Sequence, residues 1–244
     1  NDNIAAFTIN LRLGQVMTIT SNGVALTLGT GTDTEFKASK TGEHTVYVNK
    51  YKQIWVTAPN STTYSVTVNG VETKIVLIPD DTNNAQFKLS LKAGDVVVVY
   101  GSGIELLGGH YTGTQFTVTK AGEYTFYVNN EDIVYLSVIF YLKPNSNWLV
   151  DNARFAANLF GNGDTWVDLI KCGDGTYKLS LTLEQYNTYN GLIFCRMNPN
   201  TSTNNWGNKW NQTGDLVLSN SDSNLYTVAE GAWDKGEGTW STKK

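Results

Sequence analysis

The sequence predicts an all-β protein. Short segments rich in Val, Thr and aromatic residues alternate apolar with polar positions, and Gly or Asn stands between them. This pattern is typical of the strands and turns of sandwiches and barrels. Thr, Asn, Tyr and Trp are abundant and charged residues make up only 16% of the chain, a composition that favours strands. Helical periodicity is weak, and one short helical turn is expected at residues 183–189.

An internal repeat supports the same fold class. Residues 11–50 align without gaps to residues 91–130, at an offset of 80 positions, and a Tyr-Val-Asn triplet coincides in the two segments. Self-similarity of this kind indicates two copies of one small unit. We expect the second copy to begin at residues 64–70, after the loop at residues 58–63.

The third part of the chain, from about residue 139, has no counterpart upstream. We expect strands in it at residues 153–160, 177–181, 192–197 and 216–219. The sequence therefore predicts tandem β-sandwich units. Residues 1–60 form the first repeat unit, with truncation at its start left open, residues 61–138 form the second, and residues 139–244 form a larger β-sandwich.

Charge and residue usage exclude several classes of function. The net charge is −4 and no basic stripe is present, so nucleic acid and anionic membranes are poor partners. No apolar run approaches the length of a membrane span, and no signal peptide is visible, so the chain is read as mature or trimmed. With two His, a His-rich zinc site is not expected. Cys172 and Cys195 are read either as one disulfide or as two buried thiols.

The two repeat units each contain a hairpin with an aromatic pair. If the first hairpin turns at Tyr51, Tyr47 lies directly across from Trp55, while the Val and Ile residues on the opposite face form core pairs. In the second copy, Tyr127 lies across from Tyr135. Each pair is either a flat apolar ledge for a sugar or a cross-strand pair that only stabilises its sheet.

The third part places aromatic residues in polar loops. Tyr141 leads through Lys143 into a Pro-containing loop that ends at Trp148, and the segment NNWGNKWNQT contains Trp206 and Trp210. An aromatic face suits the C–H face of a sugar, and Asn and Gln suit its hydroxyls. The alternative is that these rings fold back into the core, which is expected more strongly for Trp166, Trp233 and Trp240.

No catalytic constellation is apparent. Glycosidases need two carboxylates across a cleft, and the spacing of Asp151, Asp164, Asp168 and Glu184 does not imply that placement. No nucleophile elbow, zinc-protease motif, phosphate loop or dinucleotide fingerprint occurs. No catalytic residue and no cofactor are therefore expected, although a structural Ca²⁺ at the Asp- and Asn-rich loops near residues 151–152 or 162–164 stays open.

Residues 139–220 resemble the starch-binding carbohydrate-binding module family 26, which is related to family 25. The segments that carry the resemblance are YLKPNSNW, ARFAANLFGNGDTWVDL and LIFCRMNP followed by NNWGNKWNQTGDL. The resemblance implies a β-sandwich that binds α-1,4-glucans, with Tyr141 and Trp148 stacking on glucose and Lys143 and Gln212 contacting hydroxyls. Relatives are expected to carry an aromatic residue in the ARFAA strand where this chain has Asn158, so that one ring would be missing or supplied from elsewhere.

The repeat units are similar to small modules of surface starch-degrading proteins of gut anaerobic bacteria. The whole chain thus resembles part of a secreted, noncatalytic starch-adherence protein at the cell surface, a monomer within a larger multidomain protein. The implied partners are starch, its amylose and amylopectin, and maltooligosaccharides, with Trp206 and Trp210 assisting and the repeat pairs as a second site. The alternative is a structural or adhesion array that spaces other domains or binds a protein.

Overall fold

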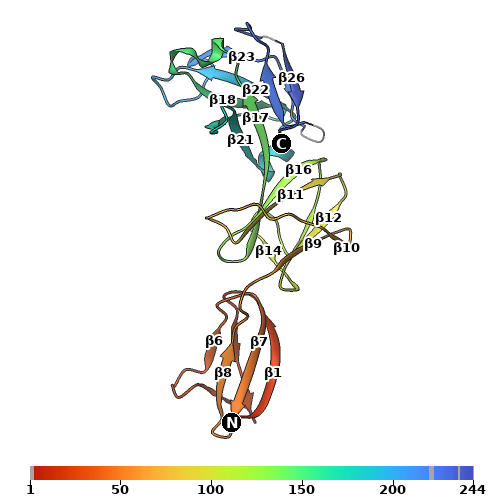
Figure 1. Ribbon diagram of the computed structural model, residues 1–244, viewed down its shortest axis with the longest axis vertical. Helices are drawn as coiled ribbons and strands as arrows, with labels where there is room; N and C mark the ends of the chain where they lie inside the picture. Colours follow the sequence, from red (N-terminus) through yellow and green to blue (C-terminus); the bar gives the residue numbers. More distant parts are fainter. Residues whose placement is uncertain (1–2, 220–222, 236, 244) are drawn as a thin grey trace. The chain divides into compact units, whose positions relative to one another are not determined.

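The computed structural model (Figure 1) describes residues 3–219, 223–235 and 237–243, and the chain forms two compact units. Unit 1 comprises Asn1–Phe87, Asp95–Thr117 and Tyr127–Tyr135, and unit 2 comprises Lys88–Gly94, Val118–Phe126 and Leu136–Lys244. The regular elements are almost all strands, so the predicted all-β class is confirmed. The three-part division of the sequence stays a prediction.

The strands before residue 60 belong to unit 1. They are β1 (Asn3–Leu11), β2 (Val16–Thr18), β3 (Thr20–Ser21), β4 (Val24–Ala25), β5 (Thr27–Leu28), β6 (Glu35–Lys37), β7 (Gly42–Asn49) and β8 (Gln53–Thr57). One sheet has the order β1-β7-β8-β5. Its inner face contributes Leu11, Val46 and Ile54 to a core that also holds Met17 and Leu26.

The next strands repeat this pattern after an added hairpin. They are β9 (Tyr64–Val68), β10 (Val71–Thr73), β11 (Ala85–Leu91), β12 (Val96–Gly101), β13 (Ile104–Glu105), β14 (Leu107–Gly108), β15 (Gln115–Thr117), β16 (Gly122–Val128) and β17 (Ile133–Lys143). At the 80-residue offset β11 is the counterpart of β1, so the β9–β10 hairpin precedes the repeated part. Asn69 and Gly70 both have positive φ at its turn, as Asn-Gly favours in two-residue hairpins.

The remaining elements lie in unit 2. They are η1 (Asn147–Asn152), β18 (Arg154–Phe160), β19 (Asp164–Asp168), β20 (Ile170–Lys171), β21 (Tyr177–Thr182), α1 (Leu183–Thr188), β22 (Gly191–Met197), β23 (Lys209–Gln212), β24 (Leu216–Val217), β25 (Leu225–Val228) and β26 (Gly238–Ser241). The predicted strands and the short helical turn are all present. The turn forms because Thr182 and Gln185 complete a reciprocal capping box.

Two sheets in unit 2 place the side chains discussed below. One has the order β19-β18-β22-β23, with β24 also paired to β22. In the other, β17 pairs antiparallel with β21 and parallel with β25. All seven residues of β22 are buried, which explains why that segment reads as a nearly continuous apolar run.

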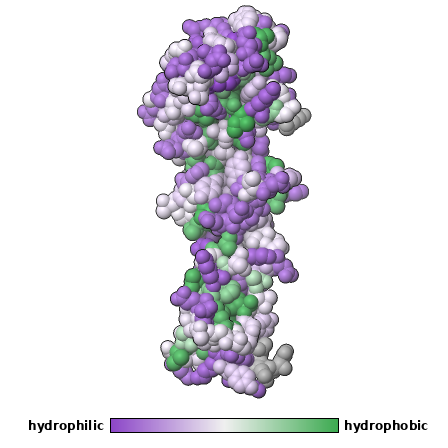
Figure 2. All heavy atoms as spheres, turned by 90° about the vertical axis from the view of Figure 1, so that its left-hand side faces the viewer, coloured by the Kyte–Doolittle hydropathy of each residue, from purple (hydrophilic) through white to green (hydrophobic). Residues whose placement is uncertain are grey.

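The surface retains large apolar side chains. On the face shown in Figure 2, green apolar residues lie among purple and white polar residues. The exposed large apolar residues include four of the seven Trp, namely Trp55, Trp206, Trp210 and Trp233. The expectation that Trp233 is a core residue is wrong, since 48% of it is exposed.

Candidate functional site

The hairpin of the first repeat unit has the predicted register. Tyr47 pairs with Trp55, and Val46 and Val48 pair with Val56 and Ile54 on the other face. Trp55 is 43% exposed, and Tyr47 beside it is half-buried. The first copy therefore presents an aromatic ledge to solvent.

The second copy repeats the register, and its loop packs on Tyr135, which is half-buried like Tyr127. The amide of Asn129 donates to the carbonyl of Ile133 (3.0 Å), and counting two residues along each strand sets Tyr127 opposite Tyr135, as predicted. Gly109 lies so close to the Tyr135 ring that an added Cβ would be 2.3 Å from it. The His110 ring packs edge-on at 5.0 Å between centroids. Tyr135 is therefore packed beneath its own loop.

Trp148 is a core residue, which corrects its expected place on an exposed platform. It is 1% exposed and its ring lies parallel to that of Phe155, with centroids 6.2 Å apart. Its indole N–H donates to the carbonyl of Trp233 (2.9 Å), and its amide donates to Asn145 Oδ1 (3.0 Å). The polar loop before Trp148 thus folds inward because Asn145 supplies the hydrogen bonds that a buried turn requires.

Tyr141 and Lys143 lie on β17, in a different sheet from Trp210 and Gln212 of β23. The ammonium of Lys243 lies 4.7 Å from the centre of the half-buried Tyr141 ring. Lys243 also pairs with Asp174 and donates to Thr176 Oγ1 (3.0 Å). Lys143 is exposed and lines a separate cavity of about 390 Å³. The face of Tyr141 is therefore occupied by a cation of the same chain.

A second aromatic surface forms on the sheet of β18, β19, β22 and β23. Residues paired across an antiparallel sheet share a face. Trp166 is paired with Asn158, Gln212 with Cys195, and Lys209 with Met197. Cys195 and Met197 pack with Trp166 in one apolar cluster, so Trp166, Lys209 and Gln212 lie on the same face of the sheet.

Trp206 joins this face from the loop before β23. Its ring meets that of Trp166 edge-on, with centroids 4.9 Å apart, and 44% of Trp206 is exposed. Arg154 holds the loop by donating to the carbonyls of Thr201 (2.6 Å) and Thr203 (3.0 Å). We call Trp166, Trp206, Lys209 and Gln212 the Trp166 face.

The polar groups of the Trp166 face are available to a ligand. Within the described residues, neither the Lys209 ammonium nor the Gln212 side-chain amide makes a hydrogen bond or ion pair. Burial raises the pKa of the neighbouring Cys195 thiol to about 12, so this thiol is neutral at pH 7 and gives Lys209 no counter-charge. Asn158 is buried and bonds Asp164, and the half-buried Trp166 lies directly across from it.

Trp210 lies apart from the Trp166 face. The register between β22 and β23 shifts at Arg196 and Met197, and this bulge turns Trp210 towards the Arg196 guanidinium, 4.7 Å from the ring centre. The two indoles of NNWGNKW therefore belong to different surfaces. Lys209 was missed because strict alternation places Trp210 and Gln212 on the same face, whereas the bulge places Lys209 on the face of Gln212. Trp166 was missed because it was expected in the core, whereas it is half-buried.

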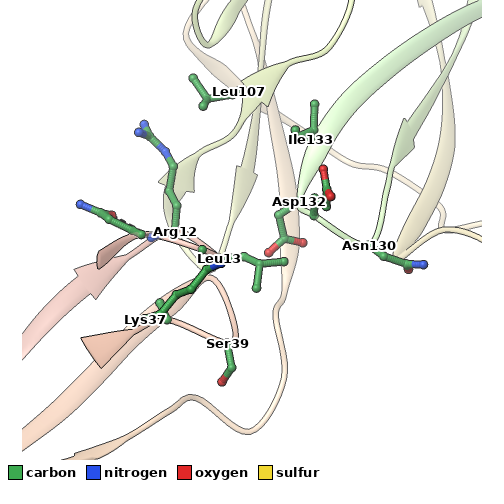
Figure 3. A pocket seen from close by; sticks show the side chains of 12 residues that line it. Arg12, Leu13, Lys37, Ser39, Leu107, Asn130, Asp132 and Ile133 are labelled. Carbon is green, nitrogen blue, oxygen red and sulfur yellow. Dashed lines mark hydrogen bonds between the residues drawn. The ribbon is translucent and has the colours of Figure 1, made fainter. Parts of the chain in front are cut away.

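A cavity of about 950 Å³ in unit 1 has a different character. Figure 3 shows Arg12, Lys37 and Asp132 around it together with Leu107 and Ile133. None of the described residues that line it is aromatic, so this cavity offers no ring for stacking.

Other features bear on the expected cofactors and bonds. Both cysteines are free, with Cys195 buried and Cys172 half-buried, so the disulfide alternative is not realised. In the described part of the chain, no group of three or more His, Cys, Asp or Glu is placed to hold a metal ion. No helix among those residues has the length and apolar character to span a membrane. Comparison with protein-family models, curated proteins and solved structures finds no match.

Proposed function

We propose that the chain binds neutral α-1,4-glucans noncatalytically, with the Trp166 face of unit 2 as its principal site. The single observation behind this proposal is that one face carries the exposed indole of Trp206 beside the side-chain hydrogen-bond donors of Lys209 and Gln212, which have no partner among the described residues. An indole face accepts the C–H face of a pyranose, and ammonium and amide groups hydrogen-bond its hydroxyls. No cofactor is needed for such binding.

The choice of α-1,4-glucan among neutral polysaccharides rests on the family 26 resemblance. That resemblance also supports tandem β-sandwich units in a secreted, cell-surface starch-adherence protein. Its expected residues enter the site in part: Gln212 and Trp206 belong to the Trp166 face, whereas Trp148 is buried. Trp166 takes the place of the missing platform ring.

Affinity at an open ledge is expected to be modest. A Kd of about 10⁻⁴ M corresponds to a binding free energy of about −5.5 kcal/mol. Starch offers many equivalent glucose units, so a second contact raises avidity when both engage one particle. The exposed Trp55 with the half-buried Tyr47 beside it is the candidate for that contact.

The experiment compares Trp206→Ala with Trp55→Ala, since the two indoles are 44% and 43% exposed. Migration of the full chain is measured in gels containing soluble starch, and maltoheptaose is titrated by tryptophan fluorescence with a cello-oligosaccharide as control. Trp206→Ala is expected to weaken binding at least about tenfold, or 1.4 kcal/mol, and Trp55→Ala to weaken it less. Both variants should keep the parent melting temperature.

Two results would count against the proposal. Undiminished α-glucan binding by Trp206→Ala would place the site elsewhere. No response of the parent chain to either sugar would favour the alternative of a spacer or adhesion array.

A further inference from the structure

A buried cation lies between two exposed indoles of unit 2. Arg196 is 3% exposed, and its guanidinium carbon lies 4.7 Å from the ring centre of Trp210 and 5.7 Å from that of Trp233. The ring centres of Trp210 and Trp233 are therefore at most 10.4 Å apart. We call Trp210 and Trp233, with Arg196 between them, the Trp210–Trp233 ledge.

The charge of Arg196 is already compensated. Its guanidinium bonds Asp151 Oδ2 at 2.8 Å and donates to the carbonyls of Trp148 (3.1 Å) and Val150 (2.8 Å). An anionic ligand would have to compete with the exposed Asp151 carboxylate for the buried Arg196 guanidinium. The ledge is therefore suited to a neutral ligand.

The ledge is held in place before any ligand arrives. The carbonyl of Trp233 accepts the indole N–H of Trp148 at 2.9 Å. The next residue, Asp234, accepts a hydrogen bond from the backbone N–H of Gln212 at 2.8 Å. The backbone N–H of Lys235 donates to the backbone carbonyl of Gln212 at 2.7 Å. These bonds fix the segment that carries Trp233 against β23, which reduces the entropy lost on binding.

Unused surface and unused polar atoms lie together at this ledge. Trp210 is 38% exposed and Trp233 is 48% exposed. Asn211 Oδ1 accepts from Arg196 at 3.3 Å, which leaves the Asn211 amide hydrogens free within the described residues. Asp151 likewise has one carboxylate oxygen without a hydrogen bond there. Flat rings beside a free donor and a free acceptor match the two kinds of surface on a pyranose.

We propose that the Trp210–Trp233 ledge is a second glycan-binding site of unit 2, separate from the Trp166 face and selective for a neutral oligosaccharide. The bulge in β23 turns Trp210 to the opposite face from Lys209 and Gln212, so one sugar ring cannot contact both surfaces. Unit 2 then binds two glucan segments at once. This inference rests on the proposed function and adds a second site to it.

The test follows each indole separately. The full chain is labelled with 5-fluorotryptophan, and the seven ¹⁹F resonances are assigned from single Trp→Phe variants. Maltoheptaose is then titrated, and the shifts of Trp206, Trp210 and Trp233 are recorded. We expect all three to move, and the Trp210 and Trp233 shifts to persist with unchanged half-saturation in the Trp206→Ala variant.

The outcomes separate the two proposals. If only the Trp206 resonance shifts, the Trp210–Trp233 ledge is not a glycan-binding site and the Trp166 face is retained. If only the Trp210 and Trp233 resonances shift, the ledge is retained and the Trp166 face is not a glycan-binding site. If no indole moves, both proposals fail. If the ledge signals stop moving once Trp206 is replaced by Ala, the ledge is not an independent site.

Variants of the ledge give an independent measurement. Trp233→Ala retains the backbone carbonyl that Trp148 uses, and it should weaken binding followed at Trp210 by about tenfold while leaving half-saturation at Trp206 unchanged. Trp210→Ala, followed at Trp233, is the second variant if Trp233→Ala lowers the melting temperature. Equal weakening at Trp206 and at the ledge would overturn the assignment of two separate sites.

Discussion

The two copies of the repeat place an aromatic pair at the same strand positions, but they differ in how far the ring on the second strand is exposed. Trp55 in the first copy is 43% exposed. Its counterpart Tyr135 lies beneath Gly109 and beside the His110 ring. The strand pairing does not differ, because β5 and β14 add in parallel to β8 and β17 at equivalent residues.

The difference lies in the loop that follows the added strand. At the 80-residue offset, His110 and Tyr111 of the second copy replace Thr30 and Gly31 of the first. Tyr111 packs against Phe116, with centroids 5.6 Å apart, and its ring lies where a Cβ on Gly108 would be. Thr30 and Gly31 of the first copy have no ring that could pack in this position. A Cβ on Gly29 would lie 3.8 Å from the Trp55 indole nitrogen, which is an ordinary contact distance.

We therefore expect the rings of His110 and Tyr111 to be the reason why Tyr135 is less exposed than Trp55. The same strands can support either a packed structural pair or an open ledge. A duplicated unit can thus keep its core while one copy exposes an aromatic ring on its surface.

The largest expected effect comes from giving the second copy the loop of the first, by the double change His110→Thr and Tyr111→Gly. Loss of the Tyr111 ring from its packing against Phe116 should lower local stability by about 2–4 kcal/mol. Hydrogen exchange of the β16 and β17 amides measures the free energy of local opening.

Tyr111→Phe is the matched control for that change. It keeps the ring and removes a buried hydroxyl that has no hydrogen-bond partner in the described part of the chain, so exchange should not accelerate. Unchanged protection in the double variant would show that the loop does not cover the pair.

A smaller effect is expected from Gly109→Ala. Its Cβ would lie within 2.8 Å of three atoms of the Tyr135 ring, and relieving that clash should cost about 1–3 kcal/mol of local stability. The cost should vanish in a Tyr135→Ala background if the ring is the cause, which a double-mutant cycle by hydrogen exchange tests.

Gly29→Ala is the comparison in the first copy. Its cost should come only from the positive φ of 53° at Gly29, about 1–2 kcal/mol. Replacing Trp55 by Ala should therefore not relieve it. Relief in that background would mean that Trp55 is packed by its loop in the same way as Tyr135.

The strand registers of both hairpins were predictable because each side chain in a strand alternates between a core face and an outer face. The side chains of Val46 and Ile54 had to face the core, and this placed Tyr47 and Trp55 opposite each other on the outer face. Coverage of the outer face depends on loops, whose paths follow from tertiary contacts. Tyr135 and Trp55 therefore looked equivalent in sequence.

The candidate site in unit 2 shows the same limit. Trp206 and Gln212 were identified from composition and resemblance, but one bulge residue reversed the face of Trp210. Trp148 sits in an amide-rich loop like Trp206, yet Asn145 folds that loop inward by bonding the carbonyls of Ala229 and Ala232. These partners are more than 80 residues away, beyond any local pattern.

The smallest effect on stability is expected from the reciprocal graft, Thr30→His with Gly31→Tyr. Gly31 is exposed and does not have positive φ, so the first copy should change stability by no more than about 0.5 kcal/mol. The new rings should nevertheless cover Trp55. In the chain labelled with 5-fluorotryptophan, the Trp55 resonance, assigned from Trp55→Phe, should lose most of its solvent isotope shift between H₂O and D₂O. A Trp55 signal as responsive as in the parent chain would show that the rings cover the pair only in the context of the second copy, and that two loop residues do not by themselves decide exposure.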